Sequence, residues 1–280
     1  MVESVIEVSA IDFPGGEYYS TLKRPLEHYE KGVFIIEGDK VVERFFDSQL
    51  IMISILLTHE LFELHRECLE KRSEKIKVYL AEKKTLAKIV GFKYHQGIIA
   101  VGRIPPLLSI DEILQNKKSG HLLVALDRLE SAENTGVLVR NCAACGVDAI
   151  IVGENSADPY LRRAVRNSMG TVFRIPVIKS QSLYETLSIL KAKHGFQILA
   201  AHPRDNSIPL PETDLIKDTC IVFGNEGEGV SSQIVDVSDY AVKIPMVSGV
   251  DSFNVACASA IMLYEVNRQR TSLNQYLLRC

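Results

Sequence analysis

The sequence lacks a long apolar run. A membrane-spanning helix needs about 20 consecutive apolar residues, and the longest such stretch here, Leu50 to Leu57, has only the length of a strand. The acidic start of the chain, MVESVIEVSAIDF, also lacks the basic segment and apolar core of a signal peptide. From both absences we expect a cytoplasmic protein with no membrane partner.

Patterned cysteines are missing as well. The chain has six cysteines, with a single C-x-x-C pair at Cys142 and Cys145. A zinc site needs a second such pair, or two histidines at ligand spacing. We therefore expect no metal site, and we interpret the pair as small residues on the buried side of a helix.

An excess of positive charge is absent from the chain as a whole. Its formal net charge of −3 argues against a protein that coats nucleic acid. Charge is nevertheless concentrated locally, because Lys71 to Lys93 contains eight basic and two acidic residues, a local charge of +6. Such a run is either an ordinary solvated surface or a face that contacts RNA phosphates, and both alternatives stay open from the run alone.

A change in the residue pattern divides the chain into two parts. Within Ile104 to Gly120, Pro105 and Pro106 stop a strand, and a polar stretch follows a short helical turn. With 280 residues, 46% of them hydrophobic, the chain is long enough to bury the cores of two modest domains. We expect a first domain at 1–104, whose residues 1–32 form an irregular extension, a linker at 105–119 and a second domain at 120–280.

The first half alternates between strand-like and helix-like segments. Its expected strands are Val33–Glu37, Ile51–Leu57, Ile76–Leu80 and Gly97–Val101. Its expected helices are Asp39–Phe46, Glu60–Arg72 and Lys83–Val90, in which apolar residues are spaced three and four apart. These segments indicate a small α/β domain.

The second half shows the same alternation. Its expected strands are Leu122–Leu126, Ala149–Val152, Arg174–Val177, Gln197–Ala200, Cys220–Phe223 and Ala241–Ile244. Its expected helices are Thr135–Cys145, Leu183–Lys193 and Asn254–Arg268. Strand–helix alternation predicts a parallel sheet with helices on both faces, and ligands of such α/β domains bind beyond the carboxyl ends of the strands.

The first segment that can carry chemistry is Glu133–Asn141, which follows the strand ending at Leu126. Asn134 is placed either to cap the next helix or to take part in a site, and the segment alone leaves both roles open. Arg140 lies in an otherwise apolar helix, between Val139 and several small residues. We expect its guanidinium to need a partner, because an unpaired buried charge is costly; a structural ion pair is the ordinary alternative.

The second segment is Ile221–Gly229, in which three glycines follow an apolar strand and let the backbone turn tightly beside a ligand. Its spacing superficially resembles a dinucleotide loop, but Glu226 and Glu228 inside the turn would repel a phosphate. The helix that a dinucleotide motif opens is also missing, since Pro245 soon follows the next strand. This charge content favours a neutral or cationic ligand, such as one that carries a sulfonium.

The third segment runs from Ile244 to Asn254 and leads into a helix that is apolar on nearly all sides from Val255 to Val266. Ser252 or Asn254 is placed to cap this helix. Because the surface of one domain cannot solvate such a helix, we expect it to be buried against its own sheet and against another subunit.

Together the three segments resemble the SpoU/TrmH family of RNA 2′-O-ribose methyltransferases, within the SPOUT superfamily. The family pattern is Asn-x-Gly with Arg four residues after that Gly, then Gly-Asn-Glu-Gly-x-Gly, then Ile-Pro-Met followed by Ser-Leu-Asn. This pattern recurs here in order, over about residues 120–270. The visible departure is Phe253 in place of the usual Leu, a hydrophobic exchange next to the expected adenine pocket.

Two segments of the first half, Phe34–Gly38 and His95–Ala100, resemble the small RNA-substrate-binding domain that is joined to many rRNA-modifying members. His95 and Gln96 alternatively do no more than begin a strand. With the basic stretch just before them, the resemblance favours RNA as the partner. The residues expected to contact RNA are Lys83, Lys84, Lys93, His95 and Gln96.

The resemblance implies an enzyme that uses S-adenosylmethionine as its cofactor. Matching the family motifs assigns the catalytic positions to Arg140, Asn134, Glu226, Ser252 and Asn254. It assigns the cofactor site to Ala200, Ala201, Gly224, Asn225, Gly227, Gly229, Ile244, Met246 and Phe253. Because the pKa of an arginine lies above 12, we expect Arg140 to position the substrate and stabilise charge rather than act as a simple base.

The resemblance also implies a trefoil knot, in which the last helix is threaded through a loop, and a homodimer. The additional N-terminal domain favours ribosomal RNA over transfer RNA as the substrate. Two other functions stay open: a catalytically inactive RNA-binding relative, and a nucleotide-dependent α/β enzyme of unrelated chemistry, which would need phosphate-binding loops that this sequence lacks.

Overall fold

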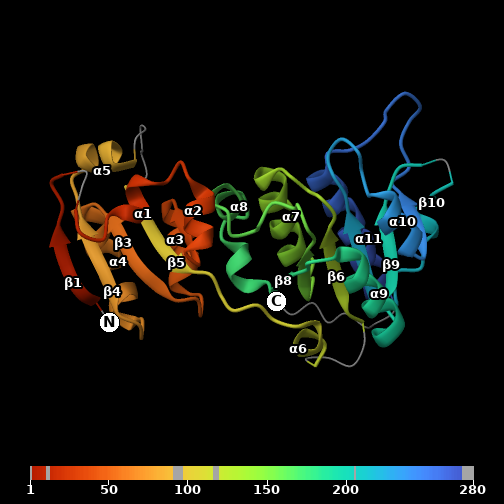
Figure 1. Cartoon of the computed structure of the whole chain (residues 1–280), viewed down its shortest axis with the longest axis horizontal. Helices are drawn as coiled ribbons and strands as arrows, with labels where there is room; N and C mark the ends of the chain where they lie inside the picture. Colours follow the sequence, from red (N-terminus) through yellow and green to blue (C-terminus); the bar gives the residue numbers. More distant parts are fainter. Residues whose placement is uncertain (1, 11–12, 91–96, 116–119, 205, 273–280) are drawn as a thin grey trace. The chain divides into compact units, whose positions relative to one another are not determined.

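The computed structural model describes residues 2–10, 13–90, 97–115, 120–204 and 206–272. The chain forms two compact units, each with its own sheet (Figure 1). Unit 1 comprises residues 1–106 and 160–173, and unit 2 comprises residues 107–159 and 174–280. Among the described residues, no helix is long and apolar enough to cross a membrane.

Unit 1 is built on a five-stranded sheet with the spatial order β1-β4-β3-β5-β2. Its strands are β1 (Val2–Glu7), β2 (Val33–Glu37), β3 (Met52–Leu57), β4 (Ile76–Leu80) and β5 (Ile98–Arg103). Strands β1, β4 and β3 are parallel, whereas β5 runs antiparallel to both β3 and β2. Its helices between residues 17 and 90 are, in chain order, α1 (Glu17–Ser20), α2 (Pro25–Glu30), α3 (Asp39–Phe46), α4 (His59–Lys71) and α5 (Lys83–Val90).

The strands and helices expected between residues 33 and 103 are confirmed to within two residues at each end. Residues 1–32, expected to be irregular, instead contribute β1, α1 and α2. Apolar periodicity could not predict them, because β1 is an edge strand with mostly exposed side chains and the two helices are only four and six residues long. Tyr19 of α1 is nevertheless fully buried, with its hydroxyl 2.7 Å from Oγ of Ser54.

A segment from the second half of the sequence, residues 160–173, also belongs to unit 1. It contains α8 (Arg162–Asn167) and most of a 3-10 helix (Thr171–Arg174). The rings of Phe173 and Phe45 lie 5.0 Å apart, and Nη2 of Arg162 lies 2.7 Å from Oε2 of the buried Glu37. The expected undivided domain at 120–280 is therefore interrupted, by contacts between residues too distant in sequence for a local pattern to show.

Unit 2 is built on a seven-stranded sheet with the order β10-β12-β9-β11-β6-β7-β8, in which every neighbouring pair is parallel. The strands are β6 (Leu122–Leu126), β7 (Ala149–Val152), β8 (Val177–Lys179), β9 (Gln197–Ala201), β10 (Ile208–Pro209), β11 (Thr219–Phe223) and β12 (Tyr240–Lys243). The helices are α6 (Ile110–Leu114), α7 (Ala132–Ala144), α9 (Leu183–His194), α10 (Ser232–Val237) and α11 (Val255–Ser272). The predicted parallel sheet is confirmed.

Helices cover both faces of this sheet, as predicted. Alternate strand residues such as Leu123 and Val222 share one core with Leu187 of α9 and Ile234 of α10. The intervening residues point to the opposite face and are buried as well, where α7 and α11 pack against each other. The three predicted helices are confirmed, as are five of the six strands, with bounds that shift by at most four residues.

One expected strand of unit 2 is wrong. The predicted strand Arg174–Val177 is the end of a 3-10 helix followed by β8, because Pro176 has no N–H to donate and the ladder begins only after it. The predicted linker contains the short helical turn that was expected there. Helix α6 begins there with a capping box between Ser109 and Glu112, and its Ile113 is buried in the core of unit 2.

The last helix is anchored at its C-terminal end by Arg270, which is only 1% exposed. Its guanidinium donates hydrogen bonds to four backbone carbonyl oxygens, those of Gly120, His121, Leu215 and Lys217, at 2.7 to 3.1 Å. These carbonyls precede β6 and β11. A buried charge is stabilised here because the backbone itself satisfies it.

Candidate active site

A cavity of about 370 Å³ opens in unit 2 beyond the carboxyl ends of β9, β11 and β12. Three loops form its walls: the residues after β9, the glycine-rich turn after β11, and the connection from β12 to α11. The lining residues that sequence analysis assigned to a site are Ala201, Gly224, Asn225, Glu226, Gly227, Gly229, Ile244, Met246, Ser252, Phe253 and Asn254. The second and third predicted segments therefore meet at one place.

The glycine-rich turn is held closed by its own backbone. Asn225 and Gly229 exchange two backbone hydrogen bonds of 3.0 and 2.9 Å. Oδ1 of Asn225 accepts from the N–H groups of Gly227 and Glu228, at 2.9 and 3.1 Å. A Cβ on Gly224 would lie 2.2 Å from the carbonyl carbon of Gly229, so only glycine permits this close approach.

The first predicted segment joins this site through a chain of side-chain hydrogen bonds. Nδ2 of Asn134 donates to Oε1 of Glu226 at 3.0 Å, and Nδ2 of Asn254 donates to Oδ1 of Asn134 at 3.1 Å. Oδ1 of Asn254 in turn accepts from the N–H of Ala256 at 2.9 Å. Asn134 does not line the cavity itself, but it links two residues that do.

Glu226 lies at the N-terminal end of α7, where backbone N–H groups favour an anion. Its carboxylate accepts from the N–H of Ser131 at 3.1 Å and from that of Glu130 at 3.4 Å. Partial burial raises the pKa of Glu226, but the hydrogen bonds from Asn134 and from these amides outweigh it, so the pKa lies below its ordinary value. The carboxylate is therefore negatively charged at neutral pH.

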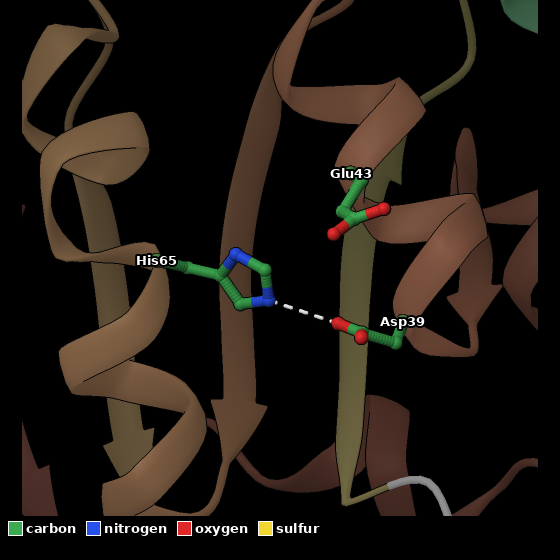
Figure 2. Close-up of side chains that lie close together, drawn as sticks. All are labelled: Asp39, Glu43 and His65. Carbon is green, nitrogen blue, oxygen red and sulfur yellow. Dashed lines mark hydrogen bonds and ion pairs between the residues drawn. The ribbon is translucent and has the colours of Figure 1, made fainter.

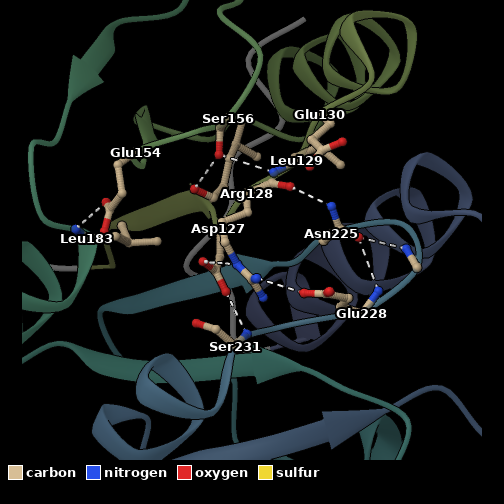
Figure 3. Close-up of polar contacts among 12 residues, drawn as sticks. Asp127, Arg128, Leu129, Glu130, Glu154, Ser156, Leu183, Asn225, Glu228 and Ser231 are labelled. Atoms are coloured by element: carbon tan, nitrogen blue, oxygen red, sulfur yellow. Dashed lines mark hydrogen bonds and ion pairs between the residues drawn. The ribbon is translucent and has the colours of Figure 1, made fainter.

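The loop after β6 adds contacts that sequence analysis missed (Figure 3). Nη1 of Arg128 donates to Oε2 of Glu228 at 2.7 Å, and Nδ2 of Asn225 donates to the carbonyl oxygen of Arg128 at 3.0 Å. Oδ2 of Asp127 accepts from the N–H of Ser231 at 2.6 Å. Arg128 has a φ of 54°, a left-handed backbone that a non-glycine residue rarely adopts. These contacts fasten both ends of the glycine-rich turn to β6, and no sequence motif indicates them.

Two predicted site residues lie elsewhere. Ala200 is fully buried inside β9, and neither it nor Arg140 lines the cavity as the described residues define it. The prediction that Arg140 is a buried charge is wrong, because its side chain is exposed on α7. Within the described part of the chain, no hydrogen bond or ion pair is found for it.

The capping predictions have mixed outcomes. The cap of α7 is Ser131, whose Oγ accepts from the N–H of Asn134 at 3.2 Å, so the capping role considered for Asn134 is wrong. At α11 the side chain of Asn254 does bond the first turn of the helix. Asn134 is thus free to use its amide on Glu226 and Asn254.

The cysteine pair lies on α7 and at its C-terminal end. Cys142 is fully buried and Cys145 is half-buried. Burial raises the pKa of both thiols, so both are neutral at physiological pH and poor ligands for a metal. The interpretation of Cys142 as a small buried helix residue is confirmed.

Unit 1 contains one group of three side chains that are capable of metal ligation, Asp39, Glu43 and His65, among the residues described (Figure 2). Nε2 of the buried His65 lies 2.8 Å from Oδ1 of Asp39, and this hydrogen bond joins α4 to α3. The ligand atoms of the three side chains lie within 4.8 Å of one another. The contact explains the burial of His65, and the absence of a metal stays a prediction.

The expected RNA-contacting residues are only partly described. Lys83 and Lys84 are exposed at the start of α5, whereas Lys93, His95 and Gln96 lie outside the described residues. One member of the basic run, Arg72, does not lie on the exposed surface that the run indicates. Arg72 is buried, with its guanidinium on the carbonyl oxygens of Phe45, Phe46 and Ser48 at 2.9 to 3.2 Å and on the carboxylate of Glu74 at 2.6 Å. That charge stabilises unit 1 and is not available to RNA.

Several proteins similar to this chain are named as RNA methyltransferases. An uncharacterized tRNA/rRNA methyltransferase of Mycobacterium bovis is 32% identical over 253 residues, which cover 88% of this chain and 84% of the relative. The 23S rRNA (guanosine-2′-O-)-methyltransferase RlmB of Acinetobacter baylyi is 31% identical over 198 residues, 70% of this chain and 79% of the relative. The crystal structure of an AdoMet-bound rRNA methyltransferase from Sinorhizobium meliloti matches with a TM-score of 0.82 and 25% identity, over 95% of this chain and 98% of that one.

Two family models match parts of this chain. The model of the SpoU rRNA Methylase family matches residues 121–264, which is more than half of the chain. A model described as RNA 2′-O ribose methyltransferase substrate binding matches residues 35–107. The chain therefore belongs to the SpoU rRNA methylase family, and the predicted family and α/β fold class are confirmed. The trefoil knot stays a prediction.

Proposed function

We propose that this protein transfers a methyl group from S-adenosylmethionine to a ribose 2′-hydroxyl of structured RNA, with ribosomal RNA as the substrate. The observation that carries the proposal is the hydrogen-bonded chain Glu226–Asn134–Asn254 at the rim of the cavity. It brings together all three segments that resemble the family motifs. The name of the Acinetobacter relative, which specifies guanosine 2′-O-methylation of 23S rRNA, supports the same reaction and substrate.

The residues of the cavity fit the proposed cofactor. Ile244, Met246 and Phe253 supply apolar surface for an adenine ring, and the turn from Gly224 to Gly229 lets backbone amides come close. The carboxylates of Glu226 and Glu228 favour a cation and disfavour a phosphate. When bound, the cofactor supplies a methyl group made electrophilic by its positive sulfur.

The protein's contribution is largely alignment. A ribose hydroxyl is a weak nucleophile, and holding it in line with the methyl group can lower the barrier by roughly 7–11 kcal/mol. We assign this positioning to Asn254 and Ser252, which line the cavity, with Asn134 and the ionised Glu226 fixing the orientation of Asn254. We assign the stabilisation of developing charge to the guanidinium of Arg140.

The place of Arg140 outside its own cavity supports a homodimer. The exposed side of α7 carries Val137 as well as Arg140, and the exposed side of α11 carries Ile261 and Tyr264, which is 67% exposed. The two helices pack against each other. A second copy that covers this apolar surface would bring Arg140 to the interface, where it can serve the partner's site.

The first test is methylation of rRNA fragments and of tRNA by the purified full chain with labelled S-adenosylmethionine, followed by mapping of the modified position. We expect label on a ribose 2′-oxygen of rRNA. Label on tRNA alone would favour the alternative substrate, and label on a base would contradict the proposal. If calorimetry detects no binding of S-adenosylmethionine, the inactive RNA-binding relative becomes the better description.

The second test uses Arg140→Ala. We expect methyl transfer to fall about 10³-fold, as when a charge-stabilising donor is removed from an active site, while the affinity for S-adenosylmethionine changes by less than about threefold. Mixing Arg140→Ala with Glu226→Ala subunits should restore part of the activity, because one site of each mixed dimer keeps both residues. Full activity of Arg140→Ala alone would exclude its role, and no recovery on mixing would exclude its action on the partner.

A further inference from the structure

His202 is a buried histidine in the wall of the cavity. It follows β9 and is only 7% exposed. Within the described residues, neither Nδ1 nor Nε2 of its ring has a hydrogen-bond partner. Buried polar atoms in folded proteins are nearly always paired. By contrast, the equally buried His65 has its Nε2 2.8 Å from Asp39.

The imidazole is held in place although its nitrogens are unpaired. The backbone N–H of His202 donates to the carbonyl oxygen of Val242 at 2.9 Å, and Oγ of Ser207 donates to the carbonyl oxygen of His202 at 2.7 Å. A Cβ on Gly229 would lie 3.0 Å from Nδ1 and 3.2 Å from Cε1 of the ring. The ring therefore lies against the glycine-rich turn, in space that the missing side chain of Gly229 leaves open.

The ring is neutral at physiological pH. Burial lowers the pKa of His202, and the nearby positive charge of Arg204 lowers it further. A neutral imidazole has one nitrogen that donates and one that accepts a hydrogen bond. It thus offers two unused hydrogen-bonding atoms without adding a positive charge that would repel a sulfonium.

We propose that the side chain of His202 binds S-adenosylmethionine directly, with its ring nitrogens hydrogen-bonded to polar groups of the cofactor. The family motifs assigned the preceding residues Ala200 and Ala201 to the cofactor and gave the side chain of His202 no role. A cofactor is the better partner than an RNA phosphate, because the carboxylates of Glu226 and Glu228 line the same cavity. The inference rests on the proposed function, which puts S-adenosylmethionine in this cavity.

The test is calorimetry of S-adenosylmethionine, S-adenosylhomocysteine and adenosine with the full chain and three variants. We expect His202→Leu to weaken S-adenosylmethionine about tenfold or more, because its partner atoms on the cofactor lose their hydrogen bonds. His202→Gln keeps a donor and an acceptor and should stay within about threefold. Ser207→Ala is the matched control, since it removes the hydrogen bond to the loop backbone but leaves the imidazole.

The outcomes separate the two proposals. If the unaltered chain binds no S-adenosylmethionine, the proposed function fails first. If it binds, and His202→Leu binds equally well, only the role of His202 fails. A loss for adenosine as well assigns the contact to the nucleoside, and a loss confined to the complete cofactor assigns it to the amino-acid end; both support the proposal. An equal loss in Ser207→Ala would overturn it, because loop structure alone would then explain the effect.

A second readout is made on the unaltered protein, and a variant serves only to assign the signals. Nitrogen NMR of the unaltered protein, with the ring signals of His202 assigned by their loss in His202→Gln, reports directly on hydrogen bonds to each nitrogen. We expect both ring signals to shift when S-adenosylmethionine is added. Signals that stay in place at saturation would overturn the proposal.

Discussion

The two ends of α11 hold their polar groups in opposite ways. At the C-terminal end, Arg270 is 1% exposed and donates to four backbone carbonyl oxygens. At the N-terminal end, Asn254 is exposed and shares hydrogen bonds with Asn134 beside a cavity. The chain satisfies the first group completely, so that group contributes stability. The side chain of Asn254 lines the cavity, where a ligand can bind.

The largest expected effect tests the C-terminal end. Arg270→Ala removes a buried side chain and its four hydrogen bonds to backbone carbonyl oxygens, and it should lower the free energy of unfolding by about 3 kcal/mol or more. Urea denaturation measures this loss. The matched control is Arg268→Ala on the same helix, whose exposed side chain pairs with Glu265 and whose loss should change stability far less. Equal losses of stability in both variants would contradict the stabilising role assigned to the buried contacts of Arg270.

The next effect tests the N-terminal end. Asn134→Ala breaks the hydrogen bonds to both Glu226 and Asn254 and should lower the rate of methyl transfer about 100-fold, because the reacting groups lose alignment. The control is Asn141→Ala on the same helix, which removes hydrogen bonds to Ala256 and Ser259 of α11 away from the cavity. We expect the control to lower stability and to keep its turnover rate. Similar turnover in the two variants would contradict the role assigned to Asn134.

A smaller effect concerns the backbone of Arg128. A side chain in the left-handed region costs about 1 kcal/mol relative to glycine, and the φ of Arg128 is 54°. Arg128→Gly and Arg128→Ala both lose the ion pair with the exposed Glu228, so this loss cancels between them. We expect the glycine variant to be more stable than the alanine variant by about 1 kcal/mol in urea denaturation. Equal stabilities would mean that this turn is not strained.

The smallest effect is a pH dependence at Glu226. Its pKa is lowered in the folded protein, so its contribution to stability is complete above the ordinary value of 4.5 and is lost as the pH falls through the folded-state pKa. The difference in unfolding free energy between the unaltered chain and Glu226→Gln should therefore be constant at neutral pH and shrink in acid. Acid denaturation series of both proteins measure it. A difference that grows in acid would contradict the hydrogen bonds assigned to this carboxylate.

Local patterns predicted the elements well but misjudged two arginines. Arg140 follows the buried Val139, yet consecutive helix residues point about 100° apart, so it faces outward. Arg72 is part of a basic run, yet carbonyl groups at the end of α3 and in the connection to β3 converge on its side chain and bury it. The neighbours of a residue in sequence do not tell which face of an element it occupies.

The sequence by itself determined the parallel α/β architecture of unit 2, the expected cavity at the carboxyl ends of its strands and the family, because period, turn residues and motif order are local properties. Only the tertiary structure decided that residues 160–173 pack in unit 1 and that Arg128 fastens the glycine-rich turn. It also decided that the two ring nitrogens of His202, in the cavity wall, find no hydrogen-bond partner among the described residues. These facts depend on contacts between residues distant in the chain. The two ends of α11 differ for the same reason: the sequence shows an arginine and an asparagine, and the fold decides which of them is satisfied.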